Sequence, residues 1–564
     1  MDDAGPLTGA RAFLDALVAQ DVRHFFNVPG NGLGPVLREL FDYPSLHYVL
    51  GLHEGGLVAM ADGYARASGR PSFANVYMAP GTANALSSIY TAHRDKSAVV
   101  VTSTQQARAT VGRDAYASGD LVAAVRPFTK WAWEVAKPER LAEALHRAFK
   151  IAATPPLGPV FLSIPSDLFP AEIDGPLTEP SRPTAVPRLG PPRPEQVQAI
   201  ADRIAGADRI LLVCGQDVLL TGAVEAVDAL ARHVGAAVVS EPWNSTLAFP
   251  DPHDLGFGEY NREILGRLAP DVIVGIGARM FVEALGSPEP GFPDGTALLA
   301  LGQSSDELGR MHPAEVACHC DVRLGVEAVH VALRDRVDDR RRSERLAHLG
   351  AYRDQITADR RALLEEYHDR SPMSLARMAV ELNRVVDRDT VIVEQSTTSG
   401  GMIRAFLDQL SPYRWFGTGG SVQGWAPGAA VGVQLARPGE PVLALLGDGG
   451  LAFSPQPVWT AGHYGIPVTW LVIDNQGYRS TRGNVHDLMQ APTAAKPDFG
   501  FDFAVDVAAV AQGFGGVRVD RVTDPADLAD TVKHALADDA PRIVHAVISP
   551  EVEFLKSHGA PMAV

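Results

Sequence analysis

Two short polar motifs, each placed directly after an apolar run, constrain this chain most strongly. Asp448 follows the run Pro441–Leu446, and Asn475, 27 positions further on (448 to 475), follows the run Pro467–Ile473. Between them, Ala452–Tyr464 is long enough for a crossover helix. The pattern predicts a strand, a crossover helix and a parallel strand, which brings the two carboxyl ends side by side.

A carboxylate and an amide oxygen at adjacent strand ends can hold one hard cation. Three glycines, at 447, 449 and 450, surround Asp448 and let backbone approach a bound phosphate closely. Mg²⁺ takes one or two protein carboxylates and shares its other positions with ligand phosphates and water. A Gly-Asp-Gly motif alone indicates only a tight turn, but Asn475 on the second strand end favours a Mg²⁺-diphosphate clamp.

This arrangement resembles the metal-diphosphate signature of thiamine-diphosphate (ThDP) enzymes. The family pattern ends in Asn-Asn, whereas this chain has Asp474-Asn475. The resemblance implies that Asp448, Asn475 and the backbone carbonyl of Gly477 ligate Mg²⁺. It also implies that the cofactor contacts Gly449, Gly450 and Tyr478.

Composition describes an ordinary globular protein of several domains. The 564 residues suggest about three domains, and the net charge of −17 disfavours nucleic acid as a partner. No window approaches about 18 uninterrupted apolar residues, so we expect no membrane span. The start, Met1-Asp2-Asp3, does not resemble a signal peptide, and three cysteines fit a reducing cytoplasm. We read Cys318-His319-Cys320 as a buried strand, because the chain offers no second ligand pair.

Apolar strand-like runs alternate with helical patterns in three stretches, 1–180, 195–335 and 371–550, which predicts three α/β domains with mainly parallel sheets flanked by helices. A proline-rich linker spans 180–194, and charged helices are expected over Arg334–Arg370. The architecture resembles the ThDP decarboxylase and acetohydroxyacid synthase superfamily. There the first domain binds the aminopyrimidine, the second is central, and the third binds diphosphate. The runs expected as strands are Val22–Asn27, Phe73–Tyr77, Ala98–Thr102, Val160–Ile164, Ile210–Cys214, Ala236–Ser240, Val272–Ile276 and Ala297–Leu301.

Glu54, in Leu52-His53-Glu54-Gly55-Gly56, resembles the activating glutamate of the family. ThDP must lose the proton on thiazolium carbon 2 to become a nucleophile. A carboxyl group hydrogen-bonded to the pyrimidine ring favours the imino tautomer that takes this proton. Alone, a glutamate at a helix N-terminus would only complement the helix dipole; beside the clamp, the catalytic role is favoured.

A third segment, Thr418–Ala426, resembles the one that props ThDP in its bent conformation. Gln423 stands at the propping position, where the family has Leu, Met or Ile, and Ser421 precedes it. The resemblance also assigns Pro29 and Thr397 to the cofactor.

Benzoylformate decarboxylase is the family that the chain resembles most, almost end to end, through segments such as Ala61–Ala65, Gly81–Ala85 and Gly432–Ala436. The substrate side differs. Tyr77 replaces one active-site histidine, Arg279–Ala284 contains no counterpart of the other, and Asn31 replaces a serine. We expect Tyr77, Asn31, Gln105 and Tyr116 to orient donor or acceptor; Arg479 and Arg482 are either carboxylate-binding or surface side chains.

The leading hypothesis is a ThDP- and Mg²⁺-dependent lyase or carboligase that decarboxylates a 2-oxo acid and releases an aldehyde or joins the product to an aldehyde or other acyl acceptor. A 2-hydroxyacyl-thioester-type lyase, a flavin-bearing acetohydroxyacid-synthase-like enzyme and a non-catalytic subunit of the same fold remain alternatives. The resemblance implies a homodimer or homotetramer in which Glu54 and Asp448 of one site come from different chains.

Overall fold

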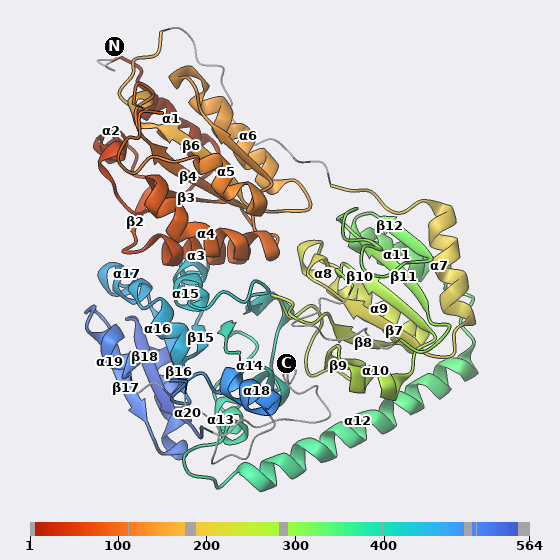
Figure 1. Cartoon of the computed structure of the whole chain (residues 1–564). Coiled ribbons are helices and arrows are strands. Elements are labelled where there is room, and N and C mark those ends of the chain that lie inside the picture. The colour runs from red at the N-terminus through yellow and green to blue at the C-terminus, as the bar shows by residue number, and fades with distance from the viewer. Residues whose placement is uncertain are drawn as a thin grey trace.

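The structure is a computed structural model that describes residues 6–110, 112–174, 186, 188–280, 292–397, 399–489, 499–502 and 505–550. It contains three sheets of six strands each, and every pairing between named strands is parallel. Helices flank each sheet (Figure 1). The predicted α/β class with three mainly parallel sheets is therefore confirmed.

The first sheet has the strand order β2-β1-β3-β4-β6-β5. Its inner strands are mostly buried, and in β4 all seven residues are buried. The strands are β1 (His24–Asn27), β2 (His47–Leu50), β3 (Ser72–Tyr77), β4 (Val99–Gln105), β5 (Trp131–Glu134) and β6 (Val160–Pro165). The helices are α1 (Gly9–Ala19), α2 (Gly34–Glu39), α3 (Glu54–Ser68), α4 (Met78–Arg94), α5 (Leu121–Val125) and α6 (Leu141–Ala153).

The second sheet has the order β12-β11-β10-β7-β8-β9 and is the sheet of the central domain. Its strands are β7 (Ile210–Cys214), β8 (Ala237–Ser240), β9 (Gly256–Glu259), β10 (Val272–Ile276), β11 (Ala297–Gly302) and β12 (Val316–His319). Its helices are α7 (Pro194–Gly206), α8 (Asp217–Leu220), α9 (Val224–Val234), α10 (Arg262–Leu268) and α11 (Val322–Ala332).

The third sheet has the order β14-β13-β15-β16-β18-β17 and carries the predicted clamp at the ends of β15 and β16. Its strands are β13 (Val391–Gln395), β14 (Trp415–Phe416), β15 (Val442–Gly447), β16 (Val468–Asp474), β17 (Arg518–Val522) and β18 (Arg542–Val547). Its helices are α13 (Leu375–Leu382), α14 (Gly400–Phe406), α15 (Trp425–Ala436), α16 (Asp448–Phe453), α17 (Gln456–Tyr464), α18 (Arg479–Met489), α19 (Val507–Gln512) and α20 (Leu528–Leu536).

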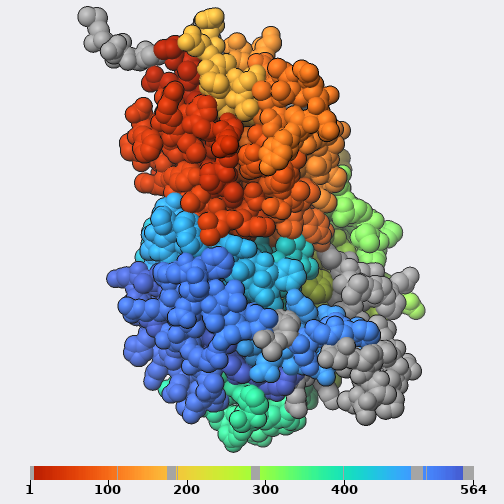
Figure 2. Space-filling model, turned by 60° about the vertical axis from the view of Figure 1, so that its left-hand side comes forward, coloured from red at the N-terminus to blue at the C-terminus, as the bar shows by residue number. Residues whose placement is uncertain are grey.

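Two contacts place the three sheets relative to one another. The long helix α12 (Asp339–Tyr367) runs from the middle domain to the third along one side of the molecule (Figure 1). The first domain rests on the third, as the red and light blue surfaces in Figure 2 show. There α3 and α15 cross at backbone distance, because a side chain at Gly432 would meet the carbonyl oxygen of Met60 at 1.8 Å and one at Gly63 that of Ala429 at 2.2 Å.

The structure refines several expectations drawn from the sequence. The crossover between the clamp strands is broken into α16 and α17, because Ser454-Pro455 interrupts the helix. The charged stretch Arg334–Arg370 forms one long helix, α12, rather than several. Residues 180–185 and 187 of the proline-rich linker lie outside the described residues.

Two further observations concern the chain as a whole. All three cysteines are buried and free. Cys318 lies on the predicted strand, β12, but this strand is at the edge of its sheet, ends at His319 and is only partly buried, so the expectation of a buried strand is wrong. Among the described residues, no helix is long and apolar enough to cross a membrane.

Candidate active site

The clamp residues meet at the carboxyl ends of β15 and β16, which are neighbours in the third sheet. Asp448 is the first residue of α16, and Asn475 follows the last residue of β16. The Asp448 carboxylate accepts hydrogen bonds from the backbone N–H groups of Gly449 and Gly477, each at 2.9 Å. These bonds link the end of β15 to the loop after β16 and orient the Asp448 carboxylate toward that loop.

Negative charge accumulates at this position without a cation to offset it. Burial and the nearby Asp474 carboxylate raise the pKa of Asp448 to about 6. Burial also acts on Asp474, but hydrogen bonds from His545 (2.7 Å) and from the N–H of Gln476 (2.9 Å) outweigh it and hold the pKa of Asp474 below its usual range. A bound divalent cation would relieve the repulsion between the two carboxylates.

Asn475 supplies the observation that decides whether a metal fits. The residue is 7% exposed, and its Oδ1 is buried with no hydrogen-bond partner among the described residues. An unpaired buried acceptor costs about 1–3 kcal/mol, so it is expected to have a ligand in the working protein. Carboxylate, amide and carbonyl oxygens from Asp448, Asn475 and Gly477 form the hard donor set that Mg²⁺ prefers. The residues present therefore fit Mg²⁺.

The backbone around Asn475 is held in a conformation that few residues adopt. Gln476 has φ 64° and Gly477 has φ 145°, and a side chain at Gly477 would meet the Phe501 carbonyl oxygen at 2.1 Å. Arg479 supports this turn by donating from Nε to the Asn475 carbonyl oxygen at 2.8 Å. Strain of this kind persists where the surroundings impose it, and it clusters at ligand sites.

The other residues predicted on the diphosphate side gather around the same strand ends. Gln423 donates to the hydroxyl of Thr397 at 3.0 Å, and its Oε1 lies 3.8 Å from the point where a Gly450 side chain would begin. Gln395, at the end of β13, accepts from the N–H of Ala426 at 3.0 Å and also donates to the Val422 carbonyl. The polar Gln423 at the propping position is thus fixed to Thr397.

The segment before Ser421 is held by residues of the other two domains. Arg66 of α3, whose side chain is 7% exposed, donates to the Gly417 carbonyl at 2.7 Å and to the Ser245 carbonyl at 2.6 Å. Asp95 accepts from the Gly419 N–H at 3.0 Å and pairs with Arg66 at 3.4 Å. One guanidinium therefore ties together all three domains next to the propping segment.

Glu54 begins α3, capped by His53, whose Nδ1 accepts from the N–H of Gly55 at 3.1 Å. The carboxylate is 8% exposed, and its Oε2 accepts from Asn84 of α4 at 3.0 Å. Its Oε1 lies 2.6 Å from where a side chain at Gly81 would begin, so glycine is required there. One oxygen is fixed by Asn84, and the other remains available to a pyrimidine ring.

The predicted substrate side is assembled around the end of β3 and the start of α4. The Tyr77 ring packs on Gly30, where a side chain would approach Tyr77 Cδ2 to 1.9 Å. Pro29 and Asn31 flank this glycine and are exposed, whereas Tyr77 is half-buried. The structure thus brings Pro29, Asn31 and Tyr77 together.

Other residues assigned to the substrate side are engaged elsewhere. Gln105 is 2% exposed, donates to the Gly119 carbonyl at 2.9 Å and accepts from the Gln106 N–H at 2.9 Å, which is the pattern of a structural amide. Its role as a substrate contact stays a prediction without geometric support. Tyr116 is 81% exposed.

The two arginines after Tyr478 pair with one aspartate. Arg479 and Arg482 donate to Asp502 at 2.6 and 2.7 Å. Because their charge is already shared with Asp502, this geometry disfavours carboxylate binding. Arg482 is 39% exposed, which fits the surface alternative, whereas Arg479 is only 10% exposed and does not fit it.

Sequence reasoning gave no role to Asn84, Arg66 or Asp95. Asn84 lies on α4 one turn beyond Gly81, so a helical projection that put Gly81 beside Glu54 would have found it. The contacts of Arg66 cross three domains, and no local sequence signal indicates them.

A three-domain α/β architecture, oxygen donors gathered at two parallel strand ends and a buried helix-terminal glutamate define a class: α/β proteins that bind a diphosphate cofactor. Family models place the chain within it. The N-terminal TPP binding domain of thiamine pyrophosphate enzymes matches residues 7–124, the central domain 197–329 and the C-terminal TPP binding domain 397–546. The chain belongs to the thiamine pyrophosphate enzyme family, as the resemblance predicted.

Individual relatives agree with this assignment over nearly the whole chain. Benzoylformate decarboxylase of Pseudomonas aeruginosa is 30% identical over 531 residues, covering 92% of this chain and 94% of that protein. A probable acetolactate synthase large subunit of Methanocaldococcus jannaschii is 26% identical, covering 96% and 92%. The solved structure of a ThDP-dependent 4-hydroxybenzoylformate decarboxylase of Rhodococcus jostii superposes with a TM-score of 0.83 at 24% identity, covering 97% of this chain and 100% of that one, which supports the fold.

Proposed function

We propose that this chain is a ThDP- and Mg²⁺-dependent carbon–carbon lyase or carboligase that acts on a 2-oxo acid. The observation that carries the proposal is the clamp: among the described residues Asn475 Oδ1 has no hydrogen-bond partner, and the N–H of the nearby Gly477 donates to the Asp448 carboxylate. When bound, ThDP supplies the nucleophilic carbon and accepts electrons as CO₂ leaves. The protein binds the cofactor, orients it and controls the protons.

Each side of the site has its own task in this proposal. Asp448, Asn475 and the Gly477 carbonyl would hold Mg²⁺ and through it the diphosphate, while Ser421 and the Thr397–Gln423 pair border the ring. Glu54 would exchange a proton with the pyrimidine ring nitrogen through Oε1, because Oε2 is already fixed by Asn84.

The residues on the substrate side are compatible with a 2-oxo acid, but they do not identify which 2-oxo acid it is. Tyr77 and Asn31 stand where benzoylformate decarboxylases have a histidine and a serine, so proton transfer to a released product lacks its usual donor. Carboligation, which consumes the activated carbon with an aldehyde or other acyl acceptor, needs that donor less. This favours a carboligase somewhat over a simple decarboxylase.

The central domain bears on the flavin-bearing alternative. At the carboxyl ends of its sheet, Lys96 of the first domain inserts and bonds Asp217 at 2.9 Å and Glu307 at 2.7 Å. A ligand in an open α/β sheet binds in this crevice. Here the chain's own side chains leave room for only about one water-sized particle, which supports a flavin-free enzyme over an acetohydroxyacid-synthase-like one with flavin.

We also propose that two chains complete each site, in a homodimer or a pair of dimers in the cytoplasm. Within one chain, the hydrogen bond that holds the Glu54 carboxylate comes from Asn84 of its own domain. Large apolar side chains are exposed on the first and third domains, among them Phe41 at 90% and Phe453 at 59%. A second copy of the chain would cover such surfaces.

The test follows substrate loss and product identity. Purified protein with ThDP and Mg²⁺ is given pyruvate, benzoylformate or a branched 2-oxo acid, with and without an aldehyde, and the products are identified by NMR. CO₂ release with a free aldehyde identifies a decarboxylase, and a hydroxyketone identifies a carboligase. Bound ThDP without turnover of any 2-oxo acid would reject the proposal and leave the thioester lyase and the non-catalytic subunit to be tested.

A further inference from the structure

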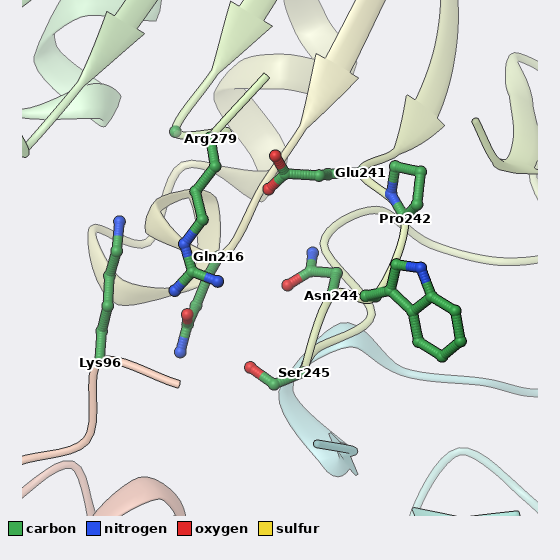
Figure 3. Close-up of a pocket in the computed structure, with 9 residues that line it drawn as sticks. Lys96, Gln216, Glu241, Pro242, Asn244, Ser245 and Arg279 are labelled. Atoms are coloured by element: carbon green, nitrogen blue, oxygen red, sulfur yellow. The ribbon is translucent and has the colours of Figure 1, made fainter. Parts of the chain in front are cut away.

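A small crevice lies where the carboxyl ends of the central sheet meet the first domain, apart from the candidate active site. It is lined by Lys96 of the first domain and, from the central domain, by Gln216, Glu241, Asn244, Ser245 and Arg279. Figure 3 shows the polar ends of Glu241, Asn244, Ser245 and Arg279 around a common space. No role in the proposed reaction has been given to any of them.

Four side chains that line this crevice carry buried polar atoms without partners. Among the described residues, no hydrogen bond reaches Glu241 Oε1, Trp243 Nε1, Asn244 Nδ2 or Ser245 Oγ. Glu241 is 5% exposed and Ser245 is 2% exposed, so water outside the protein does not satisfy them. Buried polar groups are nearly always hydrogen-bonded. Several unpaired atoms around one space therefore indicate that something occupies it.

The backbone at this place is strained as well. Lys96 has φ 48°, Trp243 has φ 56° and Met280 has φ 60°, although none of them is glycine. Left-handed conformations at non-glycine residues cluster at ligand sites. The strain is independent of the orphaned atoms and points to the same crevice.

The size of the space limits the occupant. The crevice holds about one particle the size of a water molecule, so a nucleotide or flavin does not fit. The occupant is therefore a water molecule or a monatomic ion.

The charges around the crevice decide between these two. Lys96 bonds both Asp217 and Glu307, and Arg279 bonds Glu307 at 3.1 Å. Arg94 adds a third cation, because its carbonyl accepts from Arg279 and its guanidinium is near Glu241. Asp95 and its partner Arg66 lie next to these groups and belong to the same count. Four cations therefore face three carboxylates (Asp217, Glu307 and Asp95), which leaves one positive charge unless Glu241 is ionised.

Glu241 resists ionisation because it is buried. Burial raises its pKa to about 7, against the opposing influence of Arg279 and Lys96, and the charge of Glu307 raises it further. Burial and the neighbouring Arg279 and Arg94 lower the pKa of His93, which disfavours its charged form. Below neutral pH the crevice thus combines excess positive charge with free N–H and O–H donors.

We propose that this crevice is a binding site for one monatomic anion of chloride size, held by the Asn244 amide, the Ser245 hydroxyl and the Arg279 guanidinium. Ionised Glu241 would balance the same positive charge and repel the anion, so anion binding and protonation of Glu241 accompany each other. The Ser245 carbonyl also accepts from Arg66 and from the Gly417 N–H at 2.8 Å. The anion would therefore order a loop that holds the segment leading to Ser421.

Crystals grown with bromide in place of chloride, below pH 7, give the direct test. An anomalous peak among Asn244 Nδ2, Ser245 Oγ and Arg279 is expected. A density feature without anomalous signal would identify a water molecule and overturn the proposal.

Solution measurements use the same protein with ThDP and Mg²⁺ absent, so that they are independent of the proposed reaction. At pH 6, the midpoint of thermal unfolding should rise by on the order of a few degrees in sodium chloride over sodium gluconate of equal ionic strength, because the anion binds only the folded state. At pH 8.5 the wild-type protein should lose this response, and Glu241→Gln should keep it.

Variants of the donors separate the site from general salt effects. Ser245→Ala should weaken the chloride response, and Asn244→Asp should abolish it without a lower midpoint, because the new carboxylate supplies the negative charge itself. Ser343→Ala on α12, whose hydroxyl bonds the Asp339 carbonyl on the surface, is the matched control and should respond like wild type. Equal chloride responses in wild type, Asn244→Asp and Ser343→Ala would contradict the proposal.

Discussion

The two sides of the candidate site differ in how complete they are within one chain. On the diphosphate side, Asp448 and Asp474 repel one another and Asn475 Oδ1 has no partner among the described residues. On the pyrimidine side, Glu54 is already hydrogen-bonded to Asn84. The comparison indicates that the clamp residues are arranged to bind a cation, whereas the Glu54 carboxylate is already positioned by a residue of its own domain.

The largest effect is expected from removing the carboxylate of the clamp. Asp448→Ala should weaken ThDP binding by more than about 100-fold, because changes even to outer-shell groups of a metal site cost about 10–100-fold. Chelation of Mg²⁺ in the wild-type protein should have the same effect. Calorimetric titration with ThDP checks both, and Asp474→Asn, which keeps the clamp carboxylate, should still bind. Unchanged affinity in Asp448→Ala would reject the clamp.

Loss of binding in this variant can be distinguished from misfolding by the pH dependence of stability. Asp448 has a pKa of about 6 in the fold, above the ordinary aspartate pKa of 3.8. An acid whose pKa is raised on folding destabilises the fold progressively as pH rises from the unfolded to the folded value. Without ligands, wild type should therefore lose stability between about pH 4 and pH 6 through this group, and Asp448→Ala should lack that part of the loss. Denaturant unfolding at both pH values measures it.

A smaller loss, confined to chemistry, is expected on the pyrimidine side. Glu54→Gln keeps the size and the bond to Asn84 but cannot drive the imino tautomer. ThDP should still bind, while proton–deuterium exchange at its thiazolium carbon 2 and turnover both fall by about 10²–10⁴-fold. Undiminished exchange would remove Glu54 from the mechanism.

Asn84 should matter less, since it acts only through Glu54. Asn84→Ala removes a hydrogen bond to a carboxylate, worth about 1.5–3 kcal/mol at most, and we expect roughly tenfold slower carbon 2 exchange with ThDP still bound. Ser88→Ala is the control, because its hydroxyl bonds the Gly55 carbonyl at 2.7 Å on the same helix face without touching the carboxylate. If both variants slow exchange equally, Asn84 has only a structural role.

Tyr77→Phe should leave exchange unchanged, which is the smallest effect in this series. Tyr77 packs on Gly30 at the substrate side. Its hydroxyl should influence the choice of acceptor or the ratio of aldehyde to ligated product, measured by chromatography of the product mixture. Slower exchange in this variant would move Tyr77 from substrate handling to cofactor activation.

The same two sides show what sequence reasoning can and cannot supply. We predict the clamp strands at Pro441–Leu446 and Pro467–Ile473, and the structure has them at Val442–Gly447 and Val468–Asp474. The bounds agree to within one residue because a fully buried apolar run has clear ends in the sequence. Parallel pairing then placed Asp448 beside Asn475. Edge strands such as Trp131–Glu134 are not marked by a continuous apolar run in the sequence, because their side chains are half-buried or exposed.

Contacts between distant elements lie beyond this kind of reasoning. Gln105 ends a strand at the expected edge, but its amide turns to the Gly119 and Gln106 backbone, and only the folded loop reveals that. The hydrogen bond from Arg66 to the Gly417 carbonyl likewise depends on how the three domains pack.

The central claim is that Glu54 of one chain and Asp448 of another complete one site, and mixed dimers test it most directly. Glu54→Gln and Asp448→Ala chains with different affinity tags are co-expressed, and the heterodimer is purified through both tags. If the site lies between chains, one of its two sites combines wild-type Glu54 with wild-type Asp448, so the heterodimer should regain about half the wild-type activity although each parent is inactive. A heterodimer as inactive as its parents would contradict the account and place both residues of a site on the same chain.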